Sequence, residues 1–226
     1  MSLTVGVLGG MGPAATTQFI SRVQALSHAR SDQDHLRLIV DCNPHVPDRN
    51  AAGAGGASPA QVLAQMARGL ETAGAQMLVM PCNAAHAYAS DIAAAVSIPF
   101  LNLIDAVADE ASAGGEAVGL LAADACLQAG LYQDAFARRG AELILPSEAE
   151  EARFMTLLYQ IKAGDTGAAV RRAMADLAEN LIARGARGVI AGCTEVPLVL
   201  SPADLPVPLA DSIEILAART VEAARA

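Results

Sequence analysis

Two cysteines, Cys82 and Cys193, stand at the ends of apolar runs, where a strand would give way to the next segment. Each lies at the same place in two similar stretches, GAQMLVMPCNAA at residues 74–85 and GARGVIAGCTEV at residues 185–196, which are offset by 111 residues. A structural cysteine would more naturally lie inside such a run. The positions therefore indicate two equivalent thiols that are available for chemistry.

Two equivalent thiols suit proton transfer on opposite faces of one carbon. One thiolate removes a proton from a stereocentre, a thiol on the other face returns one, and the roles exchange for the reverse reaction. We expect helix N-termini directly after Cys82 and Cys193 to favour the thiolate form. His86 and Glu195 are candidates to relay protons or to orient a thiol, although His86 would serve equally as a capping or helix-surface residue.

The segments that must position these thiols alternate between β-rich apolar runs and longer, Ala-rich stretches of helical period, which predicts an α/β fold with parallel sheets. Besides the cysteine segments, VGVLGG at residues 5–10 resembles VGLLAA at residues 118–123, so the chain looks like two copies of one unit. The predicted strands are residues 4–9, 36–41, 75–80, 98–103, 117–122, 141–145, 187–192 and 205–210.

The duplication predicts two similar α/β domains, each with a parallel four-stranded sheet, related by pseudo-twofold symmetry with an active-site cleft between them. We place the first domain at residues 1–103 plus 211–226 and the second at residues 104–210. Open parallel sheets bind ligands at the carboxyl ends of their strands. The cleft is therefore expected to present one thiol from each domain.

Composition narrows the function classes. The 226 residues carry a net charge of −9, which argues against a broad nucleic-acid surface, and no apolar stretch is long enough to span a bilayer. The start of the chain lacks the pattern of a signal peptide, so we expect a cytoplasmic protein. The four cysteines form no C-x-x-C pair or zinc-finger spacing, and no metal site is predicted.

Four motifs in order, GVLGGMGPAAT (6–16), NPHVPDR (43–49), MPCNAAH (80–86) and AGCTEVP (191–197), resemble the PLP-independent aspartate/glutamate racemase family, most of all its aspartate racemases. The resemblance covers nearly the whole chain. It implies a two-domain α/β fold, a homodimer, no cofactor, a small acidic amino acid as substrate, and catalytic cysteines at the positions of Cys82 and Cys193.

The resemblance also implies that Arg49 and Lys162 bind a substrate carboxylate. Two prolines flank the Arg49 loop, and a guanidinium matches a carboxylate bidentately. Lys162 is the only lysine of the chain, although it would also suit a solvated helix end.

Four more residues are expected at the site. Asn83 and Thr194 directly follow the thiols and suit either the α-carboxylate and amine of the substrate or helix caps. Met11 and Gly12 of the first motif are expected to support the site.

Three residues depart from the family pattern. Ala84 stands where the family commonly has threonine, and relatives often carry threonines at the positions of Ala123 and Cys126. Losing these hydroxyls removes possible carboxylate ligands and leaves more apolar space. Arg49 favours aspartate, while glutamate, a broader range of amino acids or a related small acid stays open.

Two other function classes remain. Residues 10–15 match the G-x-G-x-x-A fingerprint of dinucleotide-binding proteins, and Asp41 ends the second predicted strand, which would suit an NAD-dependent oxidoreductase. The spacing to Asp41 is longer than usual, and this reading leaves the paired cysteines unexplained. A non-catalytic protein that binds acidic amino acids would also use two lobes and a cleft.

Overall fold

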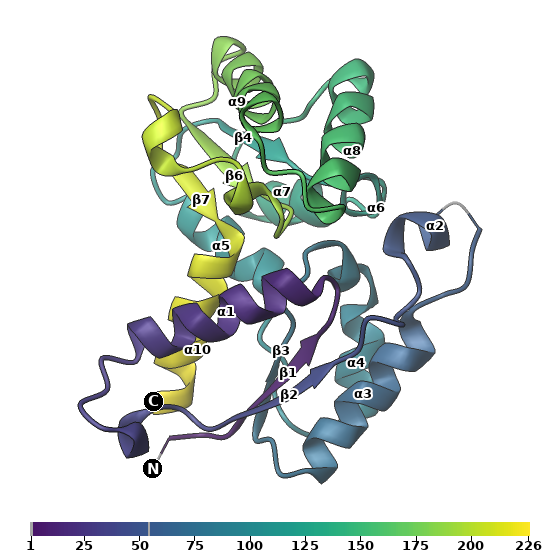
Figure 1. The fold of residues 1–226 in the computed structure, drawn as a ribbon, viewed down its shortest axis with the longest axis vertical. Helices are drawn as coiled ribbons and strands as arrows, with labels where there is room; N and C mark the ends of the chain where they lie inside the picture. The colour runs from purple at the N-terminus through teal and green to yellow at the C-terminus, as the bar shows by residue number, and fades with distance from the viewer. Residues whose placement is uncertain (1, 54) are drawn as a thin grey trace. The chain divides into compact units, whose positions relative to one another are not determined.

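The structure, a computed structural model, describes residues 2–53 and 55–226 (Figure 1). The chain divides into two compact units: Met1–Ala106 with Ile213–Ala226 form unit 1, and Val107–Ser212 form unit 2. Each is an α/β unit with its own parallel sheet, as the sequence predicts.

The sheet of unit 1 has the strand order β2-β1-β3, with β1 (Val5–Gly9) between β2 (Leu38–Cys42) and β3 (Met77–Val79). Both pairings are parallel, and Val5 lies opposite Leu38 on one side and Met77 on the other. All five residues of β1 are buried. This central strand therefore lies in the interior of the unit.

The predicted fourth strand of unit 1, residues 98–103, is wrong. Only an isolated bridge joins Phe100 to Leu78, through bonds from the Leu78 amide to the Pro99 carbonyl and from the Leu101 amide to the Leu78 carbonyl. Pro99 has no N–H to donate, and β3 ends at Val79, so the ladder cannot extend. The sheet has three strands rather than four.

The helices of unit 1 follow the parallel crossovers. The buried residues of α3, Leu63, Met66, Ala67 and Leu70, recur at the spacing of one helix face. A proline in the first turn begins α1. The helices wholly or largely in unit 1 are α1 (Pro13–Leu26), η1 (Asp32–Asp34), α2 (Arg49–Gly53), α3 (Ala60–Thr72), η2 (Ala84–Tyr88), α4 (Ala89–Ala95) and α10 (Ser212–Arg225). Helix α5 (Leu103–Ala111) continues the chain into unit 2.

Unit 2 contains the four-stranded parallel sheet that the sequence predicts. Its order is β5-β4-β6-β7, and its strands are β4 (Val118–Leu121), β5 (Leu143–Ile144), β6 (Gly188–Ala191) and β7 (Leu209–Asp211). The other helices of this unit are α6 (Asp124–Gln128), α7 (Leu131–Arg139), α8 (Glu148–Lys162), α9 (Ala168–Ala183), η3 (Val196–Leu198) and η4 (Pro202–Asp204). Helices α8 and α9 supply much of one apolar cluster against this sheet.

Close packing in unit 2 depends on small residues in the strands. A Cβ at Gly119 of β4 would lie 2.8 Å from the Cβ of Leu181 on α9, so the glycine lets this helix approach the sheet. A capping box between Ser147 and Glu150 begins α8, which ends at Lys162. The capping box defines the start of α8, and Lys162 lies in its last turn.

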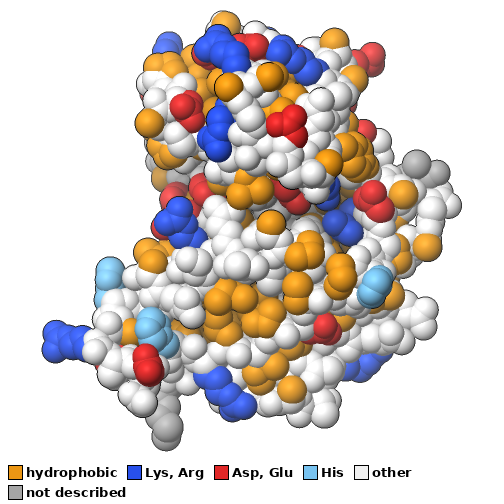
Figure 2. Space-filling model, viewed as in Figure 1, with side chains coloured by type: hydrophobic (Ala, Val, Ile, Leu, Met, Phe, Trp, Pro, Cys, Tyr) orange, Lys and Arg blue, Asp and Glu red, His pale blue; other side chains and the backbone are white. Residues whose placement is uncertain are grey.

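Basic side chains gather over helix α9 in the view of Figure 2. Arg172 of this helix pairs with Asp176 and Glu179 at 2.8 and 3.1 Å, so acidic neighbours offset part of the positive charge. Across residues 2–53 and 55–226, none of the helices has the length and apolar composition needed to cross a membrane.

Candidate active site

The first group of predicted site residues lies at the carboxyl end of the sheet of unit 1. Cys82 follows β3, Arg49 follows β2, and Met11 follows β1. Cys82, Met11, Val46 and Ala85 belong to one cluster of buried residues. The structure therefore brings the first thiol together with the segments that carry Met11 and Arg49.

Cys82 is buried, with 5% of its surface exposed. Its amide donates to the carbonyl of Met80 at 2.8 Å, which turns the chain away from the strand direction after Pro81. Asn83 is buried as well, but its side chain does not cap the following turn. Asn83 therefore occupies the N-cap position of η2 without a capping hydrogen bond from its side chain, and its place beside Cys82 still suits a substrate-binding role.

His86 is buried and uses both ring nitrogens. Nδ1 lies 2.8 Å from the carbonyl of Cys82, and Nε2 lies 3.1 Å from the amide of Leu103, while the ring stacks on Phe100. The neutral tautomer with its proton on Nδ1 satisfies both bonds, since a carbonyl accepts and an amide donates. Burial lowers the pKa of His86 to about 4. His86 thus orients the backbone of Cys82, and neither nitrogen is free to relay a proton.

Arg49 is the first residue of the short helix α2 rather than part of an open loop. Its guanidinium is half-buried and donates to the carbonyls of Pro47, Met11 and Val46 at 3.2, 3.4 and 3.5 Å. The Nε atom is buried and has no hydrogen-bond partner among the described residues. These contacts hold the cation at the carboxyl end of the sheet with hydrogen-bonding capacity to spare.

Packing explains the glycine-rich turn before α1. Gly10 has φ +94°, and a Cβ there would overlap the backbone of Asn43. Its amide donates to the Thr16 hydroxyl at 2.9 Å, and Gly12 begins α1 by accepting from the amide of Thr16. The fingerprint at residues 10–15 therefore has a structural reason that involves no dinucleotide.

The second group of predicted residues lies in unit 2 beyond β6. The Cys193 thiol donates to Oε2 of Glu195 at 3.1 Å, and the Thr194 hydroxyl donates to the same oxygen at 3.1 Å. Nζ of Lys162, at the end of α8, lies 3.7 Å from the other carboxylate oxygen. Thr194 and Glu195 are buried, while Cys193 and Lys162 are partly exposed. The structure brings all four residues into one connected cluster.

The surroundings of Cys193 raise the pKa of its thiol well above the usual value. Burial is the main cause and the negative charge of Glu195 adds to it, while the charge of Lys162 acts in the opposite direction. For Cys193 the expected lowering of the pKa by a helix N-terminus is wrong, because only the three-residue turn η3 follows this residue. The 3₁₀ segment η2 follows Cys82. Cys193 is therefore a thiol at neutral pH, with a carboxylate beside it as proton acceptor.

Tyr132 belongs to this site, although the sequence analysis did not find it. The side chain is fully buried near the start of α7, and this burial raises the pKa of Tyr132 well above its usual value, while electrostatic interactions with Cys126 and Cys193 add to the effect. A Cβ at Gly192 would lie 3.2 Å from the Tyr132 ring, so this ring packs beneath the residue before Cys193. Tyr132 was hard to identify as a site residue from the sequence, because a single tyrosine in a helical stretch normally indicates core packing.

Of the three residues that depart from the family pattern, Ala84 is next to the first group in the chain, whereas Ala123 and Cys126 follow β4, the strand that pairs with β6. Ala84 begins η2 directly after Asn83, in unit 1. Ala123 and Cys126 flank the start of α6 in unit 2 and are both buried. Within the described part of the chain, no group of three or more His, Cys, Asp or Glu residues could hold a metal ion.

Comparison with known proteins places the chain among racemases. The family described as Asp/Glu/hydantoin racemase matches residues 8–220. The broad specificity amino-acid racemase RacX of Bacillus subtilis (strain 168) is 28% identical over 223 residues, which span 96% of each chain.

Solved structures agree with this match over the whole chain. The aspartate racemase of Picrophilus torridus is 28% identical, with a TM-score of 0.89 over 99% of this chain and 94% of that protein. An aspartate racemase homologue from Pyrococcus horikoshii OT3 is 26% identical, with a TM-score of 0.79 over 99% of each chain. The two-unit α/β architecture is therefore the fold of these racemases.

Proposed function

Because the chain belongs to the Asp/Glu/hydantoin racemase family, and so is an isomerase, we propose that it interconverts L- and D-aspartate without a cofactor, using Cys82 and Cys193 as the two bases. The matching positions of the two thiols carry this proposal. Cys82 follows the strand that pairs with β1, and Cys193 follows the strand that pairs with β4. Each unit thus supplies one thiol from the carboxyl end of its sheet.

The reaction needs one thiolate and one thiol at the start of each turnover. In one direction, the thiolate of Cys82 takes the α-proton and the Cys193 thiol gives its proton to the opposite face of the planar carbanion. This leaves Cys82 protonated and Cys193 as the thiolate, which is the starting state for the reverse direction. The hydrogen bond from Cys193 to Glu195 supports the protonated state of Cys193 in the resting enzyme.

A second turnover in the same direction requires Cys82 to release its proton to solvent and Cys193 to gain one from solvent, which Glu195 can pass to the thiolate. Glu195 Oε2 can receive or return the thiol proton over 3.1 Å, and Lys162 holds the other end of the carboxylate. Lys162 is thus already close to a protein carboxylate. Its part in binding the substrate, which the sequence predicts, stays a proposal.

We propose that Arg49 holds the side-chain carboxylate of the substrate. A guanidinium forms bidentate bonds with a carboxylate, and its fixed position in unit 1 favours acidic amino acids. The similarity to an aspartate racemase supports aspartate, and the similarity to RacX supports a broader range of amino acids as the second candidate. Ala84, Ala123 and Cys126, which lack the hydroxyls of relatives, favour the broader range of amino acids.

The homodimer and the cytoplasmic location stay predictions.

Incubation with L- or D-aspartate in deuterium oxide, without added cofactor, tests the proposal. We expect the optical rotation to decay to zero from either enantiomer while the α-carbon gains deuterium. A protein that only binds amino acids would leave both unchanged, and an oxidoreductase would need added nicotinamide. Alanine and asparagine as parallel substrates measure how strictly the enzyme requires an acidic side chain.

A further inference from the structure

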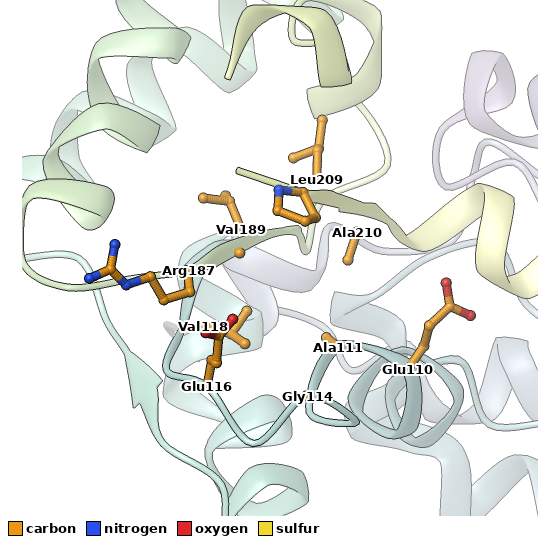
Figure 3. A pocket seen from close by; sticks show the side chains of 11 residues that line it. Glu110, Ala111, Gly114, Glu116, Val118, Arg187, Val189, Leu209 and Ala210 are labelled. Carbon is orange, nitrogen blue, oxygen red and sulfur yellow. The ribbon is translucent and has the colours of Figure 1, made fainter. Parts of the chain in front are cut away.

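A pocket of about 280 Å³ opens in unit 2 at the amino end of its sheet (Figure 3). Val118, Gly188 and Leu209, each the first residue of its strand, line it together with Ala111, the last residue of α5. Helix α5 ends there, and Gly188 and Leu209 are partly exposed at the pocket, whereas Val118 is buried. Pockets for drug-sized ligands begin at about 300 Å³, so this one suits a smaller molecule.

The pocket is separate from the proposed catalytic site. Cys193 follows the carboxyl end of β6, whereas Gly188 begins this strand, and five residues of extended chain span roughly 16 Å. A small molecule between Val118 and Leu209 would therefore not reach the thiol. Nothing in the racemase mechanism uses this end of the sheet.

Charged side chains stand at the rim of the pocket. Figure 3 shows Glu110 beyond Ala210 at one end and Glu116 beside Val118 toward the other, while the Arg187 guanidinium points away from the floor. Among the described residues, none forms a hydrogen bond or ion pair with the two glutamate side chains. Two unpaired carboxylates thus flank an apolar floor.

We propose that this pocket binds a short aliphatic diamine. The two ammonium groups would pair with Glu110 and Glu116, and the hydrocarbon between them would cover the exposed Pro208 and the partly exposed Ala111 and Leu209. The net charge of −9 favours the approach of such a dication. Arg187, the one cation of the rim, is directed away from the floor and leaves it open to a positively charged ligand.

Calorimetric and NMR titrations of the full chain with diamines of three to six carbons test this proposal. We expect saturable binding with one preferred length, and amide shifts confined to the starts of β4, β6 and β7 and the end of α5. Butylamine, which has one ammonium group, should bind more weakly by up to about fivefold, and 1,4-butanediol, which has none, more weakly still, as expected for each lost ion pair at an exposed rim. Equal affinity for butylamine, or absence of saturable diamine binding, would overturn the proposal.

Variants locate the site independently of racemase activity, so a failure here is distinct from a failure of the proposed function. Glu110→Gln and Glu116→Gln should each weaken the preferred diamine by about fivefold. Glu142→Gln, a matched charge change on an exposed residue of unit 2 that does not line the pocket, should leave the affinity unchanged. Unaltered affinity in either pocket variant, or equal loss in the control, contradicts the proposal.

A third variant fills the floor without touching a charge. A Cβ at Gly188 would lie 3.6 Å from the Pro208 carbonyl and 3.9 Å from a Val118 methyl group, which are ordinary contact distances. Gly188→Val should therefore fold and abolish diamine binding. If this variant fails to fold, the two glutamine variants still decide the question, and retained binding in a folded Gly188→Val protein argues against the site.

Discussion

Cys82 and Cys193 occupy equivalent places in the duplicated sequence, yet their neighbours differ. Cys82 lies among apolar residues, with the neutral His86 holding its carbonyl. Cys193 instead donates its proton toward a buried carboxylate that faces a lysine. The two thiols thus occupy equivalent positions in the repeat, while the side chains that contact them differ between the units.

Replacing Glu195 tests this control directly. Glu195→Gln removes the negative charge that helps to raise the pKa of Cys193, so the pKa should fall although burial keeps part of the effect. The pH dependence of alkylation by iodoacetamide, followed at the Cys193 peptide by mass spectrometry, measures the change. Glu142→Gln is the charge-matched control, and an unchanged or raised pKa in the Glu195 variant contradicts this account.

The proposed role of Arg49 is to give the enzyme a preference for an acidic side chain. Arg49→Leu should lower kcat/KM for aspartate by roughly tenfold to a hundredfold, as one charge-assisted contact is worth about 1.5–3 kcal/mol. Arg49→Lys should recover only part of this, because an ammonium lacks the fork geometry. Arg49 also donates hydrogen bonds to three backbone carbonyls, so its loss could disturb the fold. Racemisation of the substrate alanine, which has no side-chain carboxylate, therefore serves as the internal control. An equal loss for aspartate and alanine would show that Arg49 acts on folding rather than on the substrate carboxylate.

At the scale of elements, seven of the eight strands predicted from alternating apolar and Ala-rich runs are present among the described residues, because buried parallel strands are nearly continuous in hydrophobicity. The run at residues 98–103 has the same composition, but its pairing depends on how far β3 extends, which lies outside the run itself. The contact between Lys162 and Glu195 was equally hidden, since it joins a helix end to a turn 33 residues later. Periodicity describes single elements, whereas such contacts depend on their packing.

The turn between β1 and α1 offers a sharp test of local packing. Gly10→Ala places a methyl group against the backbone of Asn43 at a positive φ, and we expect a loss of about 2–4 kcal/mol in the free energy of unfolding. Gly74→Ala is the matched control, because Gly74 has φ +98° and open space around its Cβ position. It should cost only about 1–2 kcal/mol, the strain of the positive φ alone. Similar losses in the two variants, measured by urea unfolding, would show that the close approach to Asn43 is unimportant.

His86 links the end of β3 to the start of α5, and its burial makes this link sensitive to pH. The unfolded chain protonates the histidine below about pH 6.5, whereas the folded chain keeps it neutral down to about pH 4. The stabilisation is therefore complete above pH 6.5 and declines as the pH falls toward 4, by up to roughly 3 kcal/mol. His86→Gln should remove this part of the pH dependence, as seen in urea midpoints at pH 7.5 and 5. An identical slope in the variant would contradict the assignment.

At the scale of the whole molecule, two α/β units place one thiol each at the carboxyl end of a parallel sheet. The internal repeat predicted this placement, because the register of a duplication follows from the sequence. Which residues surround each thiol could not be predicted in the same way. Glu195 and His86 are not equivalent positions in the repeat, and Tyr132 has no distinctive motif.

Isotope exchange by the single-cysteine variants tests the two-thiol mechanism most directly. Cys82→Ala and Cys193→Ala should each abolish racemisation of aspartate, because inversion needs a proton donor and an acceptor on opposite faces. In deuterium oxide, the thiol that remains in each variant should still exchange the α-proton of one enantiomer slowly, and the two variants should prefer opposite enantiomers. Cys42→Ala and Cys126→Ala, which alter an exposed and a buried thiol, are the controls and should retain turnover. Near wild-type racemisation by either single variant, or exchange of the same enantiomer by both, would contradict the mechanism.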